Sequence, residues 1–351
     1  MRKMIFIMLI ISVLGSCKAN KAVIQNPVYS KIEVDTLWNG KISCRALSID
    51  TDKVWYAGNN GSYGYLSLSS EANFNGTLAR ESKKLEFRSI AQTTKYVFIL
   101  SVENPALLYR ISKEDSQVKL VYEEHHEKVF YDSMQFFNDS EGIAIGDPTE
   151  NCPSIIKTAD GGATWQKIPC NALPELADGE AFFAASNTNL ISKGNKVWLV
   201  SGGKKARVFY SGDKGNTWEA YETPIVQGGT MTGIFTADFY DESIGMIAGG
   251  NYEKPEQNFQ NKAITFNGGK TWALVAENQD FGYASCVQFF PDSQGKAIIS
   301  VGATGIFYSN DSGSVWYKLS DDKDFLTLRF INKNTAVAAG KNRIVKITFK
   351  E

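Results

Sequence analysis

An octapeptide that ends in tryptophan occurs four times in the second half of the chain. The copies are TADGGATW at 158–165, SGDKGNTW at 211–218, TFNGGKTW at 265–272 and SNDSGSVW at 309–316, so their tryptophans lie 53, 54 and 44 residues apart. A period of this size is typical of propellers and solenoids. Between the copies, short apolar or alternating runs are broken by Gly, Asn and Asp, which predicts strands and turns rather than helices.

Each repeat unit predicts four antiparallel strands. In the unit that contains the first octapeptide they lie at 131–139, 142–147, 154–158 and 164–168. Similar units along the chain add up to seven, the last completed by an early strand near 32–37, with six or eight as alternative counts. Closing a ring with an N-terminal strand removes exposed sheet edges. We therefore predict an all-β, seven-bladed β-propeller of four-stranded antiparallel blades over residues 30–351, because a β-sandwich would not explain the fixed repeat.

The residue types of the octapeptide fit a structural turn. The acid or amide at its third position can accept backbone N–H bonds, and the glycine at its fifth position can adopt positive φ without steric cost. The tryptophan can bury a large ring between the hairpin and its neighbour. We predict a structural role for Asp160, Trp165, Asp213, Trp218, Asn267, Trp272, Asp311 and Trp316.

This pattern, Ser/Thr-x-Asp-x-Gly-x-Thr-Trp, resembles the Asp box, or BNR repeat, of sialidase-like propellers. The copies at 158–165 and 211–218 match it fully, whereas the third carries Asn267 in place of Asp and the fourth Val315 in place of Thr. The resemblance implies that these Asp-box turns lie on the outside of the ring, away from any active site.

A sialidase would need three arginines to clamp a carboxylate, a Tyr–Glu pair as nucleophile and an Asp as acid/base. Parts of this set can be mapped onto Arg45, Glu180, Arg207 and Tyr283. No arginine occurs from 208 to 328, so the clamp is incomplete. A glycoside hydrolase with its site at the channel mouth stays the alternative function, using Glu180, Asp147 or Asp132 with Arg207 and Tyr283.

Longer segments resemble two linked groups of propellers. From about residue 30 to its end, the chain resembles photosystem II stability/assembly factor-like proteins. It also resembles exported Bacteroidetes propellers often labelled "oxidoreductase", in stretches such as FYDSMQFF (130–137), GIAIGDPT (142–149) and PIVQGGTMTGIF (224–235). The first group implies a docking or assembly role. The residues do not support an oxidoreductase activity, because the chain lacks a strand–GxGxxG–helix unit for a dinucleotide, a haem or Fe–S cysteine pattern and a CxxC redox pair. We predict no cofactor.

The N-terminus predicts export. Arg2 and Lys3 precede a short apolar run that ends in Leu14-Gly15-Ser16-Cys17, which resembles the lipobox of bacterial lipoproteins. The resemblance implies a signal peptide at 1–16 and a lipid anchor on Cys17 in the cell envelope, with 17–29 as a tether. An ordinary signal peptide with a chance cysteine is the alternative.

Export permits disulfides. Cys152 and Cys170 flank the first octapeptide at the positions that face each other across its hairpin, so we predict that they form a disulfide, with two free buried thiols as the alternative. The sequence leaves the state of Cys44 and Cys286 open. His125 and His126 are the only histidines, and we predict no metal site.

Polar residues at matching inner-strand positions, and charges beside glycines or in connections, are the ligand-binding candidates. The first kind comprises Gln135, Asp238, Gln288 and Arg329, and the alternative for them is the wall of a water-filled channel. The second kind comprises Asp132, Asp147, Glu180 and Arg207, of which the last two could simply pair with each other. Tyr283 completes the set.

With a net charge of −1, the chain offers no basic surface for nucleic acid. The predicted function is a monomeric, non-catalytic envelope propeller that binds a protein, peptide or glycan.

Overall fold

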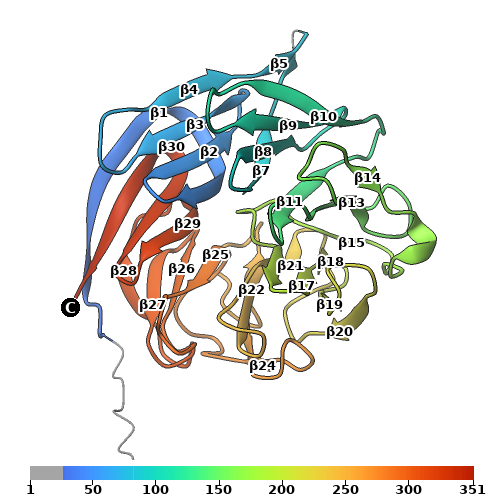
Figure 1. The fold of residues 1–351 in the computed structure, drawn as a ribbon. Coiled ribbons are helices and arrows are strands. Elements are labelled where there is room, and N and C mark those ends of the chain that lie inside the picture. The colour runs from blue at the N-terminus through green and yellow to red at the C-terminus, as the bar shows by residue number, and fades with distance from the viewer. Residues whose placement is uncertain (1–26, 82) are drawn as a thin grey trace, which may run out of the picture.

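The computed structural model describes residues 27–81 and 83–351, so the predicted signal peptide, Cys17 and most of the predicted tether lie outside the described residues. The described strands form a ring of sheets around a central axis (Figure 1). Besides strands, this part of the chain contains only the short 3-10 helix η1 (Cys170–Ala172). None of its helices is long and apolar enough to cross a membrane. The predicted all-β propeller is confirmed.

Four of the sheets have four antiparallel strands each. They consist of β7 (Phe87–Gln92), β8 (Tyr96–Ser101), β9 (Ala106–Ser112) and β10 (Val118–Glu124); β11 (Tyr131–Phe136), β12 (Gly142–Gly146), β13 (Ser154–Thr158) and β14 (Gln166–Lys167); β16 (Leu190–Lys193), β17 (Lys196–Val200), β19 (Arg207–Ser211) and β20 (Glu219–Glu222); and β25 (Ala284–Phe289), β26 (Ile298–Gly302), β27 (Gly305–Ser309) and β28 (Tyr317–Ser320).

Two further sheets have six strands, in the orders β29-β30-β1-β2-β3-β4 and β15-β18-β21-β22-β23-β24. The first contains β29 (Phe325–Asn332), β30 (Thr335–Lys350), β1 (Lys31–Asp50), β2 (Lys53–Gly58), β3 (Ser62–Ser67) and β4 (Phe74–Thr77). The second contains β15 (Glu180–Ala181), β18 (Gly202–Gly203), β21 (Thr232–Phe239), β22 (Gly245–Asn251), β23 (Lys262–Thr265) and β24 (Ala273–Leu274). A small ribbon of β5 (Ala79–Arg80) and β6 (Lys83–Lys84) stands apart.

The predicted count of seven blades is wrong, because the described strands form six blades. The count treated the two ends of the chain as separate units. In the structure β1 is continuous over 20 residues, and it pairs with β30 from Lys31 to Ser43 and with β2 from Cys44 to Asp50. Both end units therefore belong to one hydrogen-bonded sheet.

The same strand closes the ring. In Figure 1 the N-terminal strand β1, in blue, lies beside the C-terminal strand β30, in red. Next to them Tyr29, which we placed in the tether, is buried against Phe290 and Phe349. The two ends of the described chain are thus held by strand pairing and by an aromatic cluster, and this pairing leaves no open edge between them.

The core lies between neighbouring blades. Each blade turns apolar side chains of its middle strands toward the next blade, as Trp198 does when it stacks on Phe239 at 3.8 Å between ring centroids. Ring stacking of this kind adds to the hydrophobic gain from burial. The arrangement fixes the angular position of every inner strand around the axis.

The octapeptides form turns that lie against the preceding blade. In the second copy the Asp213 carboxylate accepts hydrogen bonds from the backbone N–H and the hydroxyl of Thr217, at 2.8 and 2.7 Å. Gly215 has a φ of 74°, and a Cβ atom there would lie 2.9 Å from Ile143 of β12. At the equivalent place in the first copy, a Cβ atom on Gly162 would come within 2.2 Å of Phe98 in β8. The glycine is therefore needed for close contact between blades as well as for its conformation.

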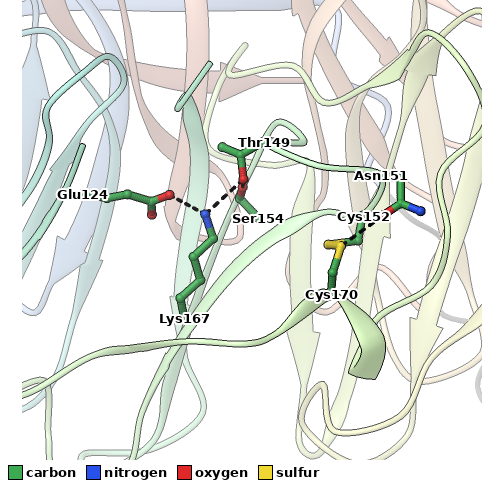
Figure 2. Close-up of a disulfide and its surroundings, with 7 residues drawn as sticks. All are labelled: Glu124, Thr149, Asn151, Cys152, Ser154, Lys167 and Cys170. Carbon is green, nitrogen blue, oxygen red and sulfur yellow. Dashed lines mark hydrogen bonds and ion pairs between the residues drawn. A yellow bond between two sulfur atoms is a disulfide. The ribbon is translucent and has the colours of Figure 1, made fainter. Parts of the chain in front are cut away.

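Cys152 and Cys170 form a disulfide with a Cα–Cα distance of 5.6 Å. Figure 2 shows it beside Asn151, while Lys167 on β14 contacts Glu124 and, at 3.2 Å, Thr149. The disulfide thus ties the end of the β13–β14 hairpin to the segment before β13. Cys44 and Cys286 are free and buried.

Candidate functional site

Six inner strands carry a β-bulge, which lies near the first residues of five of them and, in the long strand β1, near the start of its pairing with β2. The register shifts in β1, β7, β11, β21, β25 and β29 leave one extra residue in each strand. A bulge re-aims a side chain and often lies next to a functional site. The extra residues are Arg45, Arg88, Asp132, Phe235, Ser285 and Leu326.

In each of these strands, the residue three positions after the extra residue lines a pocket at one end of the central channel. These residues are Ser48, Ala91, Gln135, Asp238, Gln288 and Arg329. The pocket has a volume of about 570 Å³, and we call it the Gln288 pocket. The four polar inner-strand candidates from the sequence are therefore brought together at one end of the channel.

The channel between its two ends is closed by the segment 183–189, which we call the plug. The plug precedes the inner strand β16, which begins only at Leu190. Its polar residues are buried, with exposed fractions of 0% for Ser186 and 3% for Asn187.

The plug is hydrogen-bonded to six inner strands. Arg45 of β1 donates to Ala185 O at 3.0 Å, and the Asn187 amide donates to Ile90 O of β7 at 2.8 Å. The remaining contacts reach Met134 of β11, Thr236 of β21, Ser285 of β25 and Arg329 of β29. A segment that reaches this many strands around the ring must lie on its axis.

Most polar residues of the Gln288 pocket already have protein partners. Arg329 donates to Ser186 O of the plug at 2.9 Å, and Gln135 donates to Leu190 O at 3.3 Å. Asp238 accepts from the backbone N–H of Phe239 and of Phe289, at 2.9 and 2.7 Å, while burial raises its pKa. The sequence analysis offered two interpretations of these residues, a ligand site and the wall of a water-filled channel. Neither included hydrogen bonds to the protein's own backbone. The inner-strand polar residues largely satisfy buried backbone groups.

The opposite end of the channel holds a pocket of about 380 Å³, which we call the Tyr283 pocket. One wall is aromatic: Phe183 of the plug stacks on Phe235 at 4.0 Å between centroids, and Phe235 meets Tyr283 edge-on at 4.8 Å. Tyr252, with 49% of its surface exposed, packs edge-on against Tyr283, at 5.2 Å between the ring centroids. The sequence had pointed to Tyr283 alone of this cluster.

Two arginines from bulges line the same pocket. Arg45 uses one nitrogen for the plug, but its buried Nε has no hydrogen-bond partner among the described residues. Burial, with a further contribution from Arg88, lowers the Arg45 pKa. Arg88 donates to Glu86 at 2.7 Å and lies over the Phe130 ring at 5.7 Å. The pocket therefore offers cationic donors beside an aromatic wall.

Two acids belong to the same end of the channel. Asp147 lines the pocket, and one of its oxygens accepts the Phe182 N–H at 2.7 Å. Asp132 is completely buried, and neither of its oxygens has a partner among the described residues. Burial raises the pKa of Asp147 to about 6, and burial together with Asp147 raises the pKa of Asp132 well above its usual value.

Glu180 and Arg207 do not line either pocket. Both Glu180 oxygens contact the Arg207 guanidinium, one of them at 3.0 Å from Nε. The same carboxylate also accepts from Ser201 and from the Ala177 N–H, and its side chain has no exposed surface. The Glu180 carboxylate is therefore fully hydrogen-bonded and outside both pockets, which is the arrangement of a structural ion pair rather than of a glycosidase acid.

The structure thus divides the nine candidates among three places. Asp147 and Tyr283 line the Tyr283 pocket with Asp132 behind them; Gln135, Asp238, Gln288 and Arg329 line the Gln288 pocket; and Glu180 and Arg207 form a separate ion pair. The sequence missed Arg88, Phe183, Phe235 and Tyr252. A signal for two of these existed, because Arg88 and Phe235 stand three residues before the inner-strand positions Ala91 and Asp238.

Comparisons with known proteins support the propeller fold. No family model matches the chain, and no curated protein matches it. A solved structure described as "YCF48 bound to D1 peptide" is 13% identical, with a TM-score of 0.66, and the match covers 93% of this chain and 99% of that one.

Two further propellers are similar at comparable levels. YCF48 from Cyanidioschyzon merolae is 12% identical, with a TM-score of 0.61 over 91% of this chain and 98% of that chain. The WD40 repeats of RRP9 are 12% identical, with a TM-score of 0.64 over 93% and 99%. At these identities the likeness is one of fold, and the resemblance to assembly-factor-like propellers holds at that level.

Proposed function

We propose that this protein is a non-catalytic binding propeller that takes a peptide segment of a partner protein into the Tyr283 pocket. The observation that carries the proposal is the combination of an aromatic wall with an unused buried donor, the Nε of Arg45. An aromatic wall can bury apolar side chains, and a desolvated guanidinium can bind a backbone carbonyl or a carboxylate.

The pocket differs from its counterpart in having buried hydrogen-bonding atoms that are without a partner among the described residues. In the Gln288 pocket Gln135, Asp238 and Arg329 already have protein partners. In the Tyr283 pocket Arg45, Asp132 and Asp147 keep unused hydrogen-bonding atoms, and Tyr252 is half exposed. Binding sites are typically concave and largely apolar, with a few convergent polar groups.

The similarity in fold to a YCF48 that was solved with the D1 peptide supports a peptide rather than a glycan as ligand. We further propose that the protein acts in the cell envelope, anchored through Cys17, as the sequence at 14–17 suggests. Mass spectrometry of the membrane fraction tests the anchor, since a lipidated Cys17 would appear as a diacylated N-terminal peptide.

A display library of random linear peptides, selected against the purified protein, tests the binding function. Selected peptides should bind with a Kd that rises about tenfold in Tyr252→Ala, because this half-exposed ring contributes contact area. Tyr317→Ala is the matched control, since Tyr317 is equally exposed on β28 and lies outside the pocket.

Two results would contradict the proposal. One is equal affinity of the two tyrosine variants, which would place the peptide elsewhere. The other is turnover of chromogenic glycosides that is lost in Asp147→Asn, which would make the site catalytic.

A further inference from the structure

The carboxyl groups of Asp132 and Asp147 come from β11 and from the residue that follows its neighbour β12. Tyr131 pairs with Gly146 between β11 and β12, Asp132 is the extra residue of the β11 bulge, and Asp147 follows Gly146 directly. Asp147 reaches the surface of the Tyr283 pocket, whereas Asp132 lies behind it with no exposed surface. The pair therefore forms a two-layer acidic corner of the pocket.

This corner lacks hydrogen-bond donors. Both oxygens of Asp132 are without a partner among the described residues, and the Phe182 N–H is the single donor to Asp147 there. An unpartnered buried carboxyl group is costly, and most buried polar groups have a partner. A ligand that brings N–H donors into the corner would relieve this cost.

The charged and titratable neighbours do not supply these donors. Arg88 on β7 influences Asp132 electrostatically but directs its Nε to Glu86 at 2.7 Å. Arg45 on β1 donates to the plug at Ala185 O. Tyr252 and Tyr283 interact with Arg45 across the pocket, and their rings pack on Phe235.

We propose that the Asp132–Asp147 corner binds a primary ammonium group, so that the Tyr283 pocket selects peptides through a lysine side chain or a free N-terminus. This inference rests on the proposed peptide-binding function. An ammonium group carries three donors on a compact charge, which suits two adjacent carboxyl groups. The rings of Phe130, which already lies under Arg88, and of Phe183 line the same pocket and can bury the apolar groups next to the ammonium.

A metal ion fits the corner less well. Among the described residues, no group of three or more His, Cys, Asp and Glu side chains could hold one. Calcium needs at least about six oxygen ligands, and two acids do not approach this number.

The first experiment uses n-butylammonium chloride as the probe and the whole protein labelled with carboxyl ¹³C aspartate. Bound ammonium stabilises the ionised pair, so the Asp147 titration midpoint should fall by about one pH unit at saturating probe. Tetramethylammonium at equal ionic strength has the charge without N–H donors, and it should leave the midpoint unchanged. Equal effects of the two cations would overturn the inference.

Two variants locate the effect. Asp132→Asn keeps the shape of the side chain and should abolish the response of Asp147 to n-butylammonium. Asp178→Asn is the control and should keep the full response, because the Asp178 side chain is 98% exposed on the surface. A full response in Asp132→Asn would also overturn the inference.

The second experiment uses peptides from the display selection. Replacing one lysine by norleucine, or acetylating the N-terminus, should weaken binding at least about tenfold, and the sensitive change identifies the source of the ammonium group. Peptides that bind equally well after both changes would overturn the inference and leave the proposed function intact. A response to n-butylammonium without any peptide ligand would support the cation site and overturn the proposed function.

Discussion

At the scale of single residues, buried charges in this propeller follow two different patterns. Glu180 has lost all contact with solvent but is fully hydrogen-bonded to Arg207 and its neighbours. Asp132 has also lost contact with solvent but has no partner among the described residues. The first pattern is typical of a structural ion pair, and the second is typical of a functional group kept ready for a ligand.

The two acids of the Tyr283 pocket should make stability depend on pH. Their pKa values are raised in the folded state, so their contribution is fully present below the unfolded value of about 4 and is lost as pH rises through about 6 for Asp147. Asp132→Asn should therefore be more stable than the wild type at pH 8, by about 1–3 kcal/mol, and much closer to it at pH 4. Urea unfolding at both pH values measures the difference, and a wild type that gains stability from pH 4 to pH 8 relative to this variant would contradict the expectation.

Glu180→Gln should destabilise the protein by about 3 kcal/mol, because it leaves the largely buried Arg207 guanidinium with a neutral partner. Glu222→Gln is the matched control. Glu222 pairs with Lys205 on the same blade, but its side chain is 64% exposed, and exposed pairs contribute little. Denaturant unfolding of both variants measures the contrast, and similar losses in the two would rule out a special role for the buried pair.

At the scale of elements, the octapeptide turn joins each blade to the one before it. Its glycine lies against the second strand of the preceding blade, at Phe98, Ile143, Trp198 and Met246 in the four copies. Its acid or amide holds the loop in the required shape. The turn therefore contributes to packing between blades, which explains why it recurs at the period of the blades.

Asp213→Ala should lower the free energy of unfolding by about 1–2 kcal/mol, because it removes the acceptor for the Asn216 and Thr217 backbone N–H groups. Asp213→Asn should cost less than half as much, since the natural turn at Asn267 uses an amide that accepts from the Thr271 N–H at 3.0 Å. Thermal unfolding of the two variants at neutral pH measures the difference. Equal losses would mean that the charge, and not the acceptor geometry, holds the turn.

The same turns should weaken in acid. Burial opposes ionisation of Asp213, but hydrogen bonds from Thr217 and Ser211 outweigh it and lower the pKa to about 2. A depressed pKa contributes stability that is present above the unfolded value of about 4 and is lost as pH falls through about 2. Asp213→Asn should therefore lose less stability than the wild type as the pH falls below 4. If the free energy of unfolding of the two proteins falls equally with pH in this range, the expectation is contradicted.

At the scale of the whole molecule, the plug and the closure of the ring determine the shape of the sites. The plug separates the channel into two pockets and supplies the floor of one of them with Phe183, Ala184 and Ala185. β1 and β30 join the two ends of the chain in one sheet. Both features combine residues that are far apart in the sequence.

Asn187 provides a test of the plug, because its side chain bonds Met134 N and Ile90 O on two inner strands, and its φ is 58°. Asn187→Gly should lower the free energy of unfolding by about 2 kcal/mol, because it removes these two hydrogen bonds. Asn187→Ala should cost about 1 kcal/mol more, because alanine is disfavoured at positive φ. Guanidinium unfolding gives both values, and two variants as stable as the wild type would show that the plug does not hold the strands together.

The sequence by itself determined the fold class and the local geometry. Octapeptide spacing predicts a propeller because each copy specifies its own turn. The disulfide prediction needed only that Cys152 and Cys170 lie near each other across one hairpin, because the strands pair one residue away from the expected register, Ile156 with Lys167, and Cys170 lies in η1 after β14. The blade count went wrong at the ends of the chain, where the decisive feature is that one strand, β1, pairs with both β30 and β2. An early strand near 32–37 was predicted to complete the last unit, but no local pattern showed that this strand continues into the pairing with β2.

The site was decided by the tertiary structure. A polar residue looks the same in sequence whether it holds the plug, as Arg329 on β29 does, or lines an open pocket, as Asp147 after β12 does. What separates the two cases is whether a partner arrives from elsewhere in the chain, and the plug provides that partner at one end of the channel. At the other end no partner reaches the oxygens of Asp132 among the described residues, and this unmet hydrogen-bonding capacity is a property that only the packed ring creates.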